Sequence, residues 1–79
     1  MKDIIPNSLR YHREQMGLRQ RDVAEALGLD ITDRISHWEK GHAYPSVVNL
    51  FKLSVLYRVA PQALYPNLYR AIANGIFSE

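Results

Sequence analysis

Apolar residues recur every three or four positions through most of the chain, which is the spacing of one face of an α-helix. The clearest instances in the first half of the chain are Val23, Ala24, Leu27, Ile35 and Trp38. Gly28 separates the two groups and Gly41 follows the second, and glycine readily adopts the left-handed backbone that ends a helix. The pattern therefore predicts a helix, a tight turn and a second helix.

The second of these helices is predicted at about residues 31–40 and has two different sides. Ile35 and Trp38 form an apolar side. Short hydrogen-bonding side chains form the other side, namely Thr32, Asp33, Ser36 and His37. We take Asp30 as the N-cap, with Thr32 as the competing choice. A short helix of this kind suits insertion into the major groove of DNA, although an ordinary amphipathic surface helix has the same pattern.

Capping residues and glycines set the bounds of the helices that come before. Asn7 or Ser8 can cap a first helix, which runs to about Met16 and is closed by Gly17. The second helix opens with Gln20 and leads to the tight turn. We therefore expect two helices ahead of the one with the polar side.

The second half of the chain predicts three further helices. Ser46 can cap a fourth helix that runs to about Arg58. Its core face is predicted to comprise Val47, Leu50, Leu53, Ser54 and Tyr57. A fifth short helix is expected at about residues 61–64, where proline suits the first turn. Asn67 can cap a short sixth helix, and Gly75 can end it.

These elements predict an all-α protein, a compact bundle of five short helices with a helix-turn-helix, followed by a short C-terminal sixth helix. We expect an N-terminal arm at residues 1–6, a helical domain at 7–65 and a C-terminal helical extension at 66–79. A chain of 79 residues lies near the lower limit for an unaided core, and it has no cysteine for disulfides or thiolate metal sites. The fold must therefore rest on apolar packing.

In their order and spacing, these residues resemble the phage-repressor-like (Cro-like, XRE) helix-turn-helix DNA-binding family. The resemblance covers roughly residues 8–65. It rests on Arg13, Gly17, Leu18, Gln20, Val23, Ala24, Leu27, Gly28, Ile35, Ser36, Trp38, Glu39, Gly41, Pro45, Ser46 and Leu50. It implies that the helix at about residues 31–40 reads base edges. The turn before that helix is one residue longer than the common family spacing.

The resemblance also implies which residues contact DNA. Base contacts fall on Thr32, Asp33, Ser36 and His37. Asp33 is unusual there, and it can either accept a hydrogen bond from cytosine N4 or stabilise the helix start. Candidate phosphate contacts are Gln20, Lys40, His42 and Tyr44. Arg19 stands where the family usually has a threonine or serine cap, and its five donors suit a phosphate contact instead.

Arg13 and Glu39 are expected to form an ion pair between two helices. In the family, an arginine and a glutamate at the matching positions commonly pair. A separate physical reason supports the same pair, because an exposed Glu39 would repel the phosphates that its helix approaches. Turning it towards a guanidinium removes that repulsion and allows a bidentate contact. The alternative is two exposed charges that contribute little.

The distribution of charge is more informative than its total. The formal net charge is only +2, but Arg10, Arg13, Arg19 and Arg21 all lie in the first third of the chain. Clustered cations near a polar helix are what phosphate contacts require. The alternative is a basic face that is simply solvated.

The C-terminal segment and the fourth helix offer apolar surface for a dimer contact. The residues concerned are Val48, Val55, Leu68, Tyr69, Ile72, Ile76 and Phe77. Operators for such domains usually match a two-fold axis of the protein, which favours a homodimer. The alternative is that the segment folds back on the fourth helix of its own chain.

Together these features predict a sequence-specific regulator of transcription that binds double-stranded DNA, with no enzymatic activity and no cofactor. We find no glycine-rich phosphate loop, no spacing that singles out a catalytic triad, and no third ligand beside His37 and His42. No apolar run approaches the ~20 residues that span a bilayer, so we expect a cytoplasmic protein without a signal peptide or membrane contact. The alternative is a protein-interaction module such as an antitoxin or adaptor, whose partner binds the C-terminal segment.

Overall fold

The computed structural model describes residues 4–77, and the chain is helical through most of that range. Its six helices are α1 (Leu9–Gln15), α2 (Gln20–Leu27), α3 (Asp33–Glu39), α4 (Val47–Tyr57), α5 (Pro61–Leu64) and α6 (Pro66–Phe77). No strand occurs between residues 4 and 77. The predicted all-α class, with five short helices and a sixth, is therefore confirmed. The first three residues of the expected arm and the last two of the expected extension lie outside the described range.

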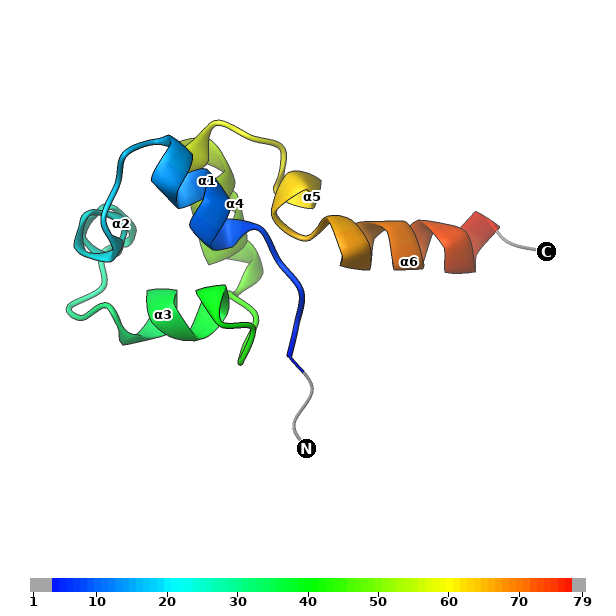
Figure 1. The fold of residues 1–79 in the computed structure, drawn as a ribbon, viewed down its shortest axis with the longest axis horizontal. Helices are drawn as coiled ribbons and strands as arrows, with labels where there is room; N and C mark the ends of the chain where they lie inside the picture. The colour runs from blue at the N-terminus through cyan, green and yellow to red at the C-terminus, as the bar shows by residue number, and fades with distance from the viewer. Residues whose placement is uncertain (1–3, 78–79) are drawn as a thin grey trace.

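Helices α1 to α5 surround one apolar core, and α6 extends away from it (Figure 1). The buried side chains are Leu9, Val23, Ala24, Leu27, Ile35, Trp38, Leu53, Tyr57, Leu64 and Tyr65. Every helix from α1 to α5 contributes at least one of them. Helix α2 packs against both α3 and α4, while α1 packs against α3. The apolar spacing of the sequence therefore predicted most of the core.

The core face predicted for α4 was wrong at one position. Val47 is 69% exposed, whereas Leu53, Ser54 and Tyr57 are buried and Leu50 is half-buried. Val47 is the first residue of the helix and lies at the edge of the arc that the buried positions define. Its side chain therefore remains in contact with solvent.

Ser8 occupies the cap position of the first helix without a side-chain cap hydrogen bond, and Asn7, the other residue expected, supplies a hydrogen bond to the helix start instead. The Asn7 side-chain oxygen accepts a hydrogen bond from the backbone N–H of Leu9 at 3.0 Å. Ser8 has a different role, because its hydroxyl donates to the carbonyl of Ala63 and its backbone N–H donates to the carbonyl of Leu64. Ser8 therefore ties the start of α1 to α5.

The second helix begins at Gln20, as expected, without a cap from the Arg19 side chain. The backbone N–H of Arg19 instead donates to the Asp22 carboxylate at 2.8 Å. This hydrogen bond, together with the neighbouring Arg19 guanidinium, lowers the pKa of Asp22 below its ordinary value. Asp22 therefore satisfies part of the helix start from within the first turn.

The third helix begins later than expected, and Asp30 is not its N-cap. The helix starts at Asp33, and Thr32 occupies the cap position without a side-chain cap hydrogen bond. After the left-handed Gly28, the N–H of Leu29 bonds back to the carbonyl of Ala24 at 2.8 Å. The residues between Leu29 and Asp33 are needed to bring the chain to the start of α3. The longer turn therefore leaves fewer residues for the beginning of the helix.

The ends of α4 and the start of α5 agree with the sequence. The Ser46 hydroxyl accepts from the N–H of Asn49 at 3.1 Å, which confirms the expected cap. The helix ends at Tyr57, and Arg58 adopts a left-handed backbone with φ 59°. Pro61 is the first residue of α5, where its fixed φ suits a helix start.

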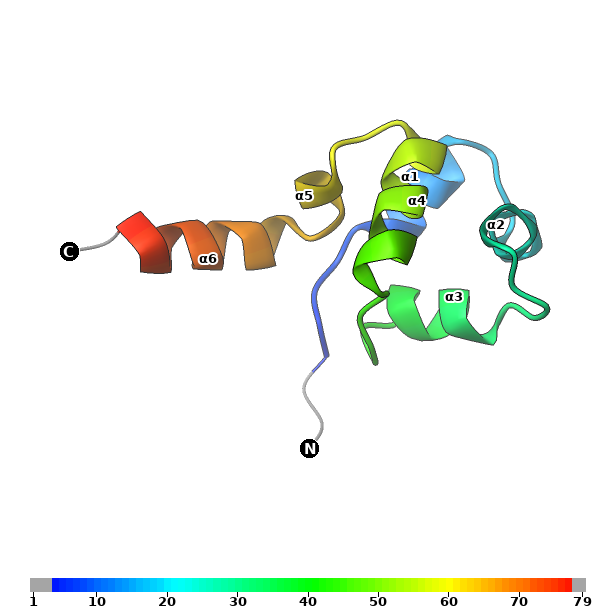
Figure 2. The same cartoon turned by 180° about the vertical axis from the view of Figure 1, so that it is seen from behind.

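The sixth helix is longer than expected at both ends. It begins at Pro66, so Asn67 is its second residue and not its cap. It also continues through Gly75, which does not have a positive φ. The helix packs against α5 and does not lie along α4, as the view from behind confirms (Figure 2). The described helices include none that is long and apolar enough to cross a bilayer.

Candidate nucleic-acid interface

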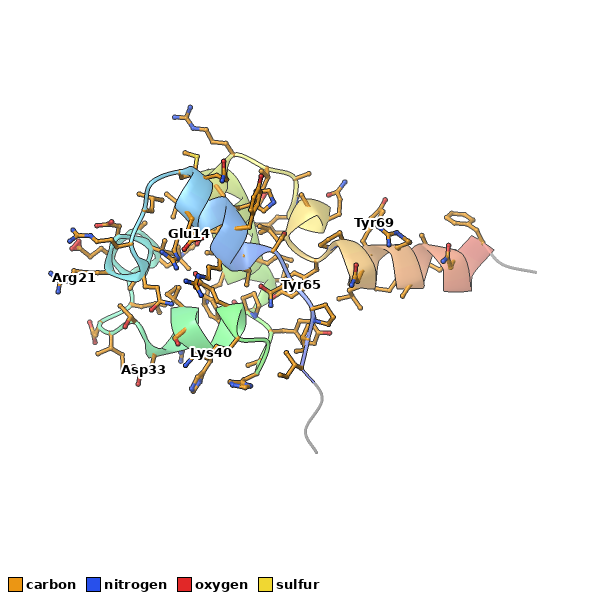
Figure 3. The ribbon with its side chains drawn as sticks, viewed as in Figure 1. Glu14, Arg21, Asp33, Lys40, Tyr65 and Tyr69 are labelled. Atoms are coloured by element: carbon orange, nitrogen blue, oxygen red, sulfur yellow. The ribbon has the colours of Figure 1, made fainter. Side chains whose placement is uncertain are left out.

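Helices α2 and α3 form the predicted helix-turn-helix, with α3 held by its apolar side. Ile35 and Trp38 are both buried in the core. The opposite side of α3 remains accessible, because Asp33 and His37 are exposed and Ser36 is half-buried. Figure 3 shows Asp33 and Lys40 along α3, on the side of the molecule away from α1. The helix is therefore fixed on one side and offers polar groups on the other.

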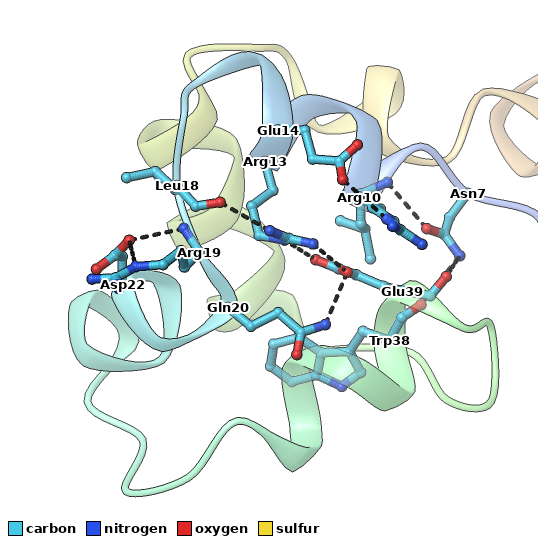
Figure 4. Close-up of polar contacts among 11 residues, drawn as sticks. Asn7, Arg10, Arg13, Glu14, Leu18, Arg19, Gln20, Asp22, Trp38 and Glu39 are labelled. Carbon is cyan, nitrogen blue, oxygen red and sulfur yellow. Dashed lines mark hydrogen bonds and ion pairs between the residues drawn. The ribbon is translucent and has the colours of Figure 1, made fainter.

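An ion pair joins the end of α3 to α1 (Figure 4). Arg13 Nε donates to Glu39 Oε2 at 2.6 Å, and Arg13 Nη2 donates to Glu39 Oε1 at 3.2 Å. The side chains are only 11% and 5% exposed, respectively. The hydrogen bond to Glu39 raises the pKa of Arg13 above its ordinary value, despite the opposing effect of burial. The pair expected from the sequence is thus present and is largely shielded from solvent.

Gln20 connects α2 to the same carboxylate. Its Nε2 donates to Glu39 Oε1 at 3.1 Å, while Arg13 Nη1 donates to the carbonyl of Leu18 at 2.9 Å. Glu39 therefore accepts hydrogen bonds from both α1 and α2. A buried carboxylate with several donors is much less costly than an isolated one, so this cluster fixes α3 relative to the two helices beneath it.

Asn7 is a second connection to α3, and no local pattern in the sequence indicates this role. Its Nδ2 donates to the carbonyl of Trp38 at 3.1 Å and to the carbonyl of Ile5 at 3.0 Å. The last carbonyls of a helix have no partner within the helix, so a side-chain donor satisfies them. Asn7 therefore supports the start of α1 and also holds the end of α3. The first role has a local sequence signal, but the second depends on a contact between residues 31 positions apart.

Gly41 lets the N-terminal segment pass close to the end of α3. The N–H of Ile5 donates to the carbonyl of Gly41 at 2.9 Å. Gly41 has φ 77°, and a Cβ at this position would lie 2.8 Å from the Ile5 backbone nitrogen and against the side chain of Ile4. A larger residue would therefore both strain the backbone and push the segment away.

The loop after α3 carries three of the expected phosphate contacts, and all three are exposed. These are Lys40, His42 and Tyr44. The N–H of His42 donates to the carbonyl of His37 at 2.9 Å, and the two imidazole rings meet edge to face with centroids 6.0 Å apart. The Tyr44 ring lies against the buried Tyr65 ring at a centroid distance of 5.6 Å. The loop is therefore held close to both α3 and the core.

A polar hollow of about 280 Å³ lies where α1, α2 and α3 meet. It is lined by Arg10, Arg13, Gln20, Ser36, Glu39 and Lys40. Two expected phosphate contacts, Gln20 and Lys40, are thus brought together with one expected base contact, Ser36. Arg19 is not among the lining residues and is exposed near Asp22, with Nε 3.5 Å from the carboxylate. No group of three or more His, Asp or Glu side chains between residues 4 and 77 is placed to hold a metal ion.

Comparison with known proteins relates this geometry to a family. The helix-turn-helix family model matches residues 9–64. The HTH-type transcriptional regulator DicA of Escherichia coli (strain K12) is 35% identical over 57 residues, which make up 72% of this chain and 42% of DicA. The chain therefore spans less than half the length of this relative. No solved structure matches the chain significantly.

Proposed function

We propose that this chain, which belongs to the Cro-like (XRE) helix-turn-helix family of DNA-binding proteins, regulates transcription by binding a specific site on duplex DNA. The observation that carries the proposal is the two-sided character of α3. Ile35, Trp38 and Glu39 hold one side of the helix, and the other side offers donors and acceptors to a partner. The major groove is about 12 Å wide and admits one helix of this kind.

Base reading is assigned to Thr32, Asp33, Ser36 and His37. His37 and Asp33 are exposed, so they have the freedom to reach base edges. Asp33 lies in the first turn of α3, where its charge is favourable to the helix dipole. From there it can also accept from cytosine N4. Ser36 lies one turn further on and borders the polar hollow.

Phosphate binding is assigned to Arg19, Gln20, Lys40, His42 and Tyr44. The Glu39 carboxylate would oppose this binding if it were exposed, but Arg13 and Gln20 neutralise and cover it. Arg19 forms a long, exposed ion pair with Asp22, and such pairs contribute little. Arg19 can therefore exchange that contact for a phosphate with little loss of free energy. Gln20 has a second N–H on its amide besides the one that Glu39 accepts.

The experiment that tests this proposal separates base reading from phosphate binding. Selection from random duplex DNA gives the preferred site, and binding of His37→Ala is then compared with the unchanged protein. We expect a loss of about 1–3 kcal/mol on the best site and a relaxed preference at one position.

Lys40→Ala is the matched control on the neighbouring loop. It should weaken binding to all duplexes alike and reduce the salt dependence of binding. If neither the unchanged protein nor any variant is retained on duplex DNA at low salt, the proposed function is wrong. If His37→Ala keeps the same sequence preference, the assignment of base contacts on α3 is wrong.

A second candidate function is a protein-interaction module, such as an antitoxin or adaptor on the same fold. The exposed apolar side chains of α6 favour it, because surfaces of this kind bind other proteins. Stable binding of a partner protein by a chain without salt-dependent affinity for duplex DNA would support this function instead of the first.

A further inference from the structure

We propose that an apolar groove between α4, α5 and α6 binds a small, neutral, aromatic molecule, and that the Tyr65 hydroxyl donates a hydrogen bond to an oxygen of this ligand. The groove has a volume of about 430 Å³. Ligand sites in proteins commonly measure roughly 300–1,000 Å³. Tyr65, which forms part of its wall, lies where the packed helices meet α6 (Figure 3).

The Tyr65 hydroxyl is the first reason for this assignment. The residue is only 5% exposed, and its hydroxyl has no hydrogen-bond partner among residues 4–77. A buried donor without a partner carries a desolvation cost, which a phenylalanine of the same shape avoids. Burial raises the pKa of Tyr65 to about 12, so the hydroxyl keeps its proton at neutral pH. An acceptor oxygen from a ligand would complete the missing hydrogen bond.

The lining of the groove determines the rest of the ligand. Its aromatic members are Tyr44, Phe51, Tyr65 and Tyr69. Aromatic rings pack favourably in offset or edge-to-face arrangements, which favours a ring as the apolar part of the ligand. None of the lining residues in the described part of the chain is charged. Because an ion buried without a partner is costly, the ligand is expected to be neutral.

Tyr44 is the part of the wall that has room to move. Its ring lies against the Tyr65 ring with centroids 5.6 Å apart, and its charge contributes to the raised pKa of Tyr65. Tyr44 is 53% exposed and belongs to the loop between α3 and α4. Exposed side chains change rotamer readily. We therefore expect the ligand to turn Tyr44 outward and to reach the Tyr65 hydroxyl from the groove.

The buried position of the hydroxyl favours a small molecule over a protein surface as the occupant. A protein surface packs on exposed side chains, whereas Tyr65 is almost completely covered. A molecule with one ring and one short polar group fits the volume of the groove and can pass beside Tyr44.

The ligand would also affect DNA binding through Tyr44, and this consequence rests on the proposed function. Tyr44 is one of the residues assigned to phosphate binding. A ligand that turns its side chain removes it from the position that it has in the free protein. The affinity for duplex DNA should therefore fall about two- to tenfold when the groove is filled, which is the size of one lost hydrogen bond.

Titration of the 79-residue chain with acetophenone, without DNA and followed by NMR, tests the site. Acetophenone has one aromatic ring and one carbonyl oxygen. We expect saturable shifts at the methyl groups of Leu50, Leu68 and Ile72, with a dissociation constant of about 1 mM, as suits so small a molecule. Tyr65→Phe should raise this constant about fivefold through loss of one hydrogen bond. Tyr11→Phe, an exposed tyrosine on α1, is the matched control and should leave it unchanged.

Two further probes separate the contributions of the oxygen and of the neutral charge. Ethylbenzene resembles acetophenone in shape but lacks the oxygen, so Tyr65→Phe should change its dissociation constant by less than about twofold. Benzoate is of similar size but charged, and it should bind at least about tenfold more weakly than acetophenone.

Several results would overturn the site. The first is no saturation up to about 20 mM acetophenone. The second is an equal effect of Tyr65→Phe on acetophenone and ethylbenzene, and the third is equal binding of benzoate and acetophenone. The same methyl shifts on raising the protein concentration, with no probe present, would show that a second copy fills the groove instead.

The effect on DNA is measured separately, on the duplex that the unchanged protein prefers. At about 5 mM acetophenone, the affinity for DNA should fall, and it should fall less in Tyr65→Phe. An unchanged affinity would overturn the consequence for DNA binding. Failure of the chain to bind any duplex would contradict the proposed function, whereas the titration without DNA decides the ligand site independently.

Discussion

Glu39 shows how a single side chain can fix the orientation of a helix that must meet a partner. Its carboxylate receives Arg13 from α1 and Gln20 from α2, and it is almost completely shielded from solvent. The pairing with Arg13 could be predicted from the sequence, because an anion near phosphates has a physical reason to turn inward. The contact between Asn7 and Trp38 could not, since it depends on how distant segments pack and has no local pattern.

We predict that the Arg13–Glu39 pair is strongly coupled. Either Arg13→Ala or Glu39→Ala should lower the free energy of unfolding by about 3–5 kcal/mol, because each leaves the other charge buried without its partner. Arg13→Lys should also be destabilising, since an ammonium lacks the planar fork that holds both carboxylate oxygens. A double-mutant cycle measured by urea unfolding gives the interaction energy.

The exposed pair between Arg10 and Glu14 provides the control for this cycle. It has the same residue types on α1, but its side chains are largely in solvent. Its coupling should be no more than about 0.5 kcal/mol. Additive losses in the Arg13–Glu39 cycle, similar to those of the control, would contradict the prediction.

The buried hydroxyl of Tyr65 leads to a prediction of how the free energy of unfolding changes at alkaline pH. Its hydroxyl is buried without a hydrogen-bond partner among the described residues, and burial raises the pKa of Tyr65 from 10.0 to about 12. Burial also raises the pKa of Tyr57. A raised pKa means that the folded state holds the proton more tightly than the unfolded state. The contribution of the protonated Tyr65 to the free energy of unfolding is therefore complete below pH 10 and is lost as the pH rises from about 10 to 12.

Tyr65→Phe should remove the contribution of this residue to the alkaline loss. At pH 7 it should raise the free energy of unfolding by about 1 kcal/mol, because a buried hydroxyl without a partner carries a desolvation cost. Urea unfolding at a series of pH values measures both effects. Tyr11→Phe, an exposed tyrosine on α1, should change the stability at pH 7 by less than about 0.5 kcal/mol. A large destabilisation by Tyr65→Phe at pH 7 would show that the hydroxyl has a favourable contact.

At the scale of the elements, the sequence predicted which helices form better than where they begin. Helices with a local start signal, such as Ser46 before α4 and Pro61 in α5, agree with the structure. The start of α3 was misplaced because Asp30 has a good capping side chain but lies in a turn whose length depends on tertiary packing. The end of α6 was misplaced because Gly75 permits, but does not require, a left-handed backbone.

The close approach of the N-terminal segment to the end of α3 gives a prediction at this scale. Gly28 and Gly41 have the same φ of 77°, so alanine causes similar backbone strain at both positions. A Cβ at Gly28 meets nothing within 4 Å, whereas a Cβ at Gly41 meets the backbone of Ile5. Gly28→Ala should cost about 1–2 kcal/mol from backbone strain alone.

Gly41→Ala should cost at least about 1 kcal/mol more than Gly28→Ala, because it adds a steric clash to the same strain. Thermal or urea unfolding of the two variants, compared under identical conditions, measures the difference. Equal losses in the two variants would show that the segment moves aside without cost and does not support the end of α3.

The whole molecule divides into a packed part and a projecting part. Helices α1 to α5 supply nine of the ten core side chains, Tyr65 directly after α5 supplies the tenth, and α6 buries none of its own. The fold class was predictable because the apolar side chains that recur along α1 to α5 pack against one another within one chain. The packing of α6 was not predictable, because its exposed apolar side chains are compatible with folding back on α4 or with pairing to a second copy. In the structure α6 extends away from the core and does not fold back along α4.

This division predicts how the chain responds to loss of α6. A chain that ends after Tyr65 keeps all ten core side chains, so its cooperative unfolding should persist. Its free energy of unfolding should lie within about 1 kcal/mol of that of the full chain, measured at concentrations where the full chain is monomeric. The homodimer expected from the sequence predicts, in contrast, that the full chain becomes more stable as its concentration rises, because the folded state alone would pair. For such a pairing the gain per chain would reach about 1.6 kcal/mol at a total chain concentration of 100 times the dissociation constant, because the free partner is then itself depleted. Thermal unfolding of both chains at about 2 and 200 µM measures this difference. A midpoint that rises with concentration in the shortened chain as well would place the assembly surface on α1 to α5 and not on α6.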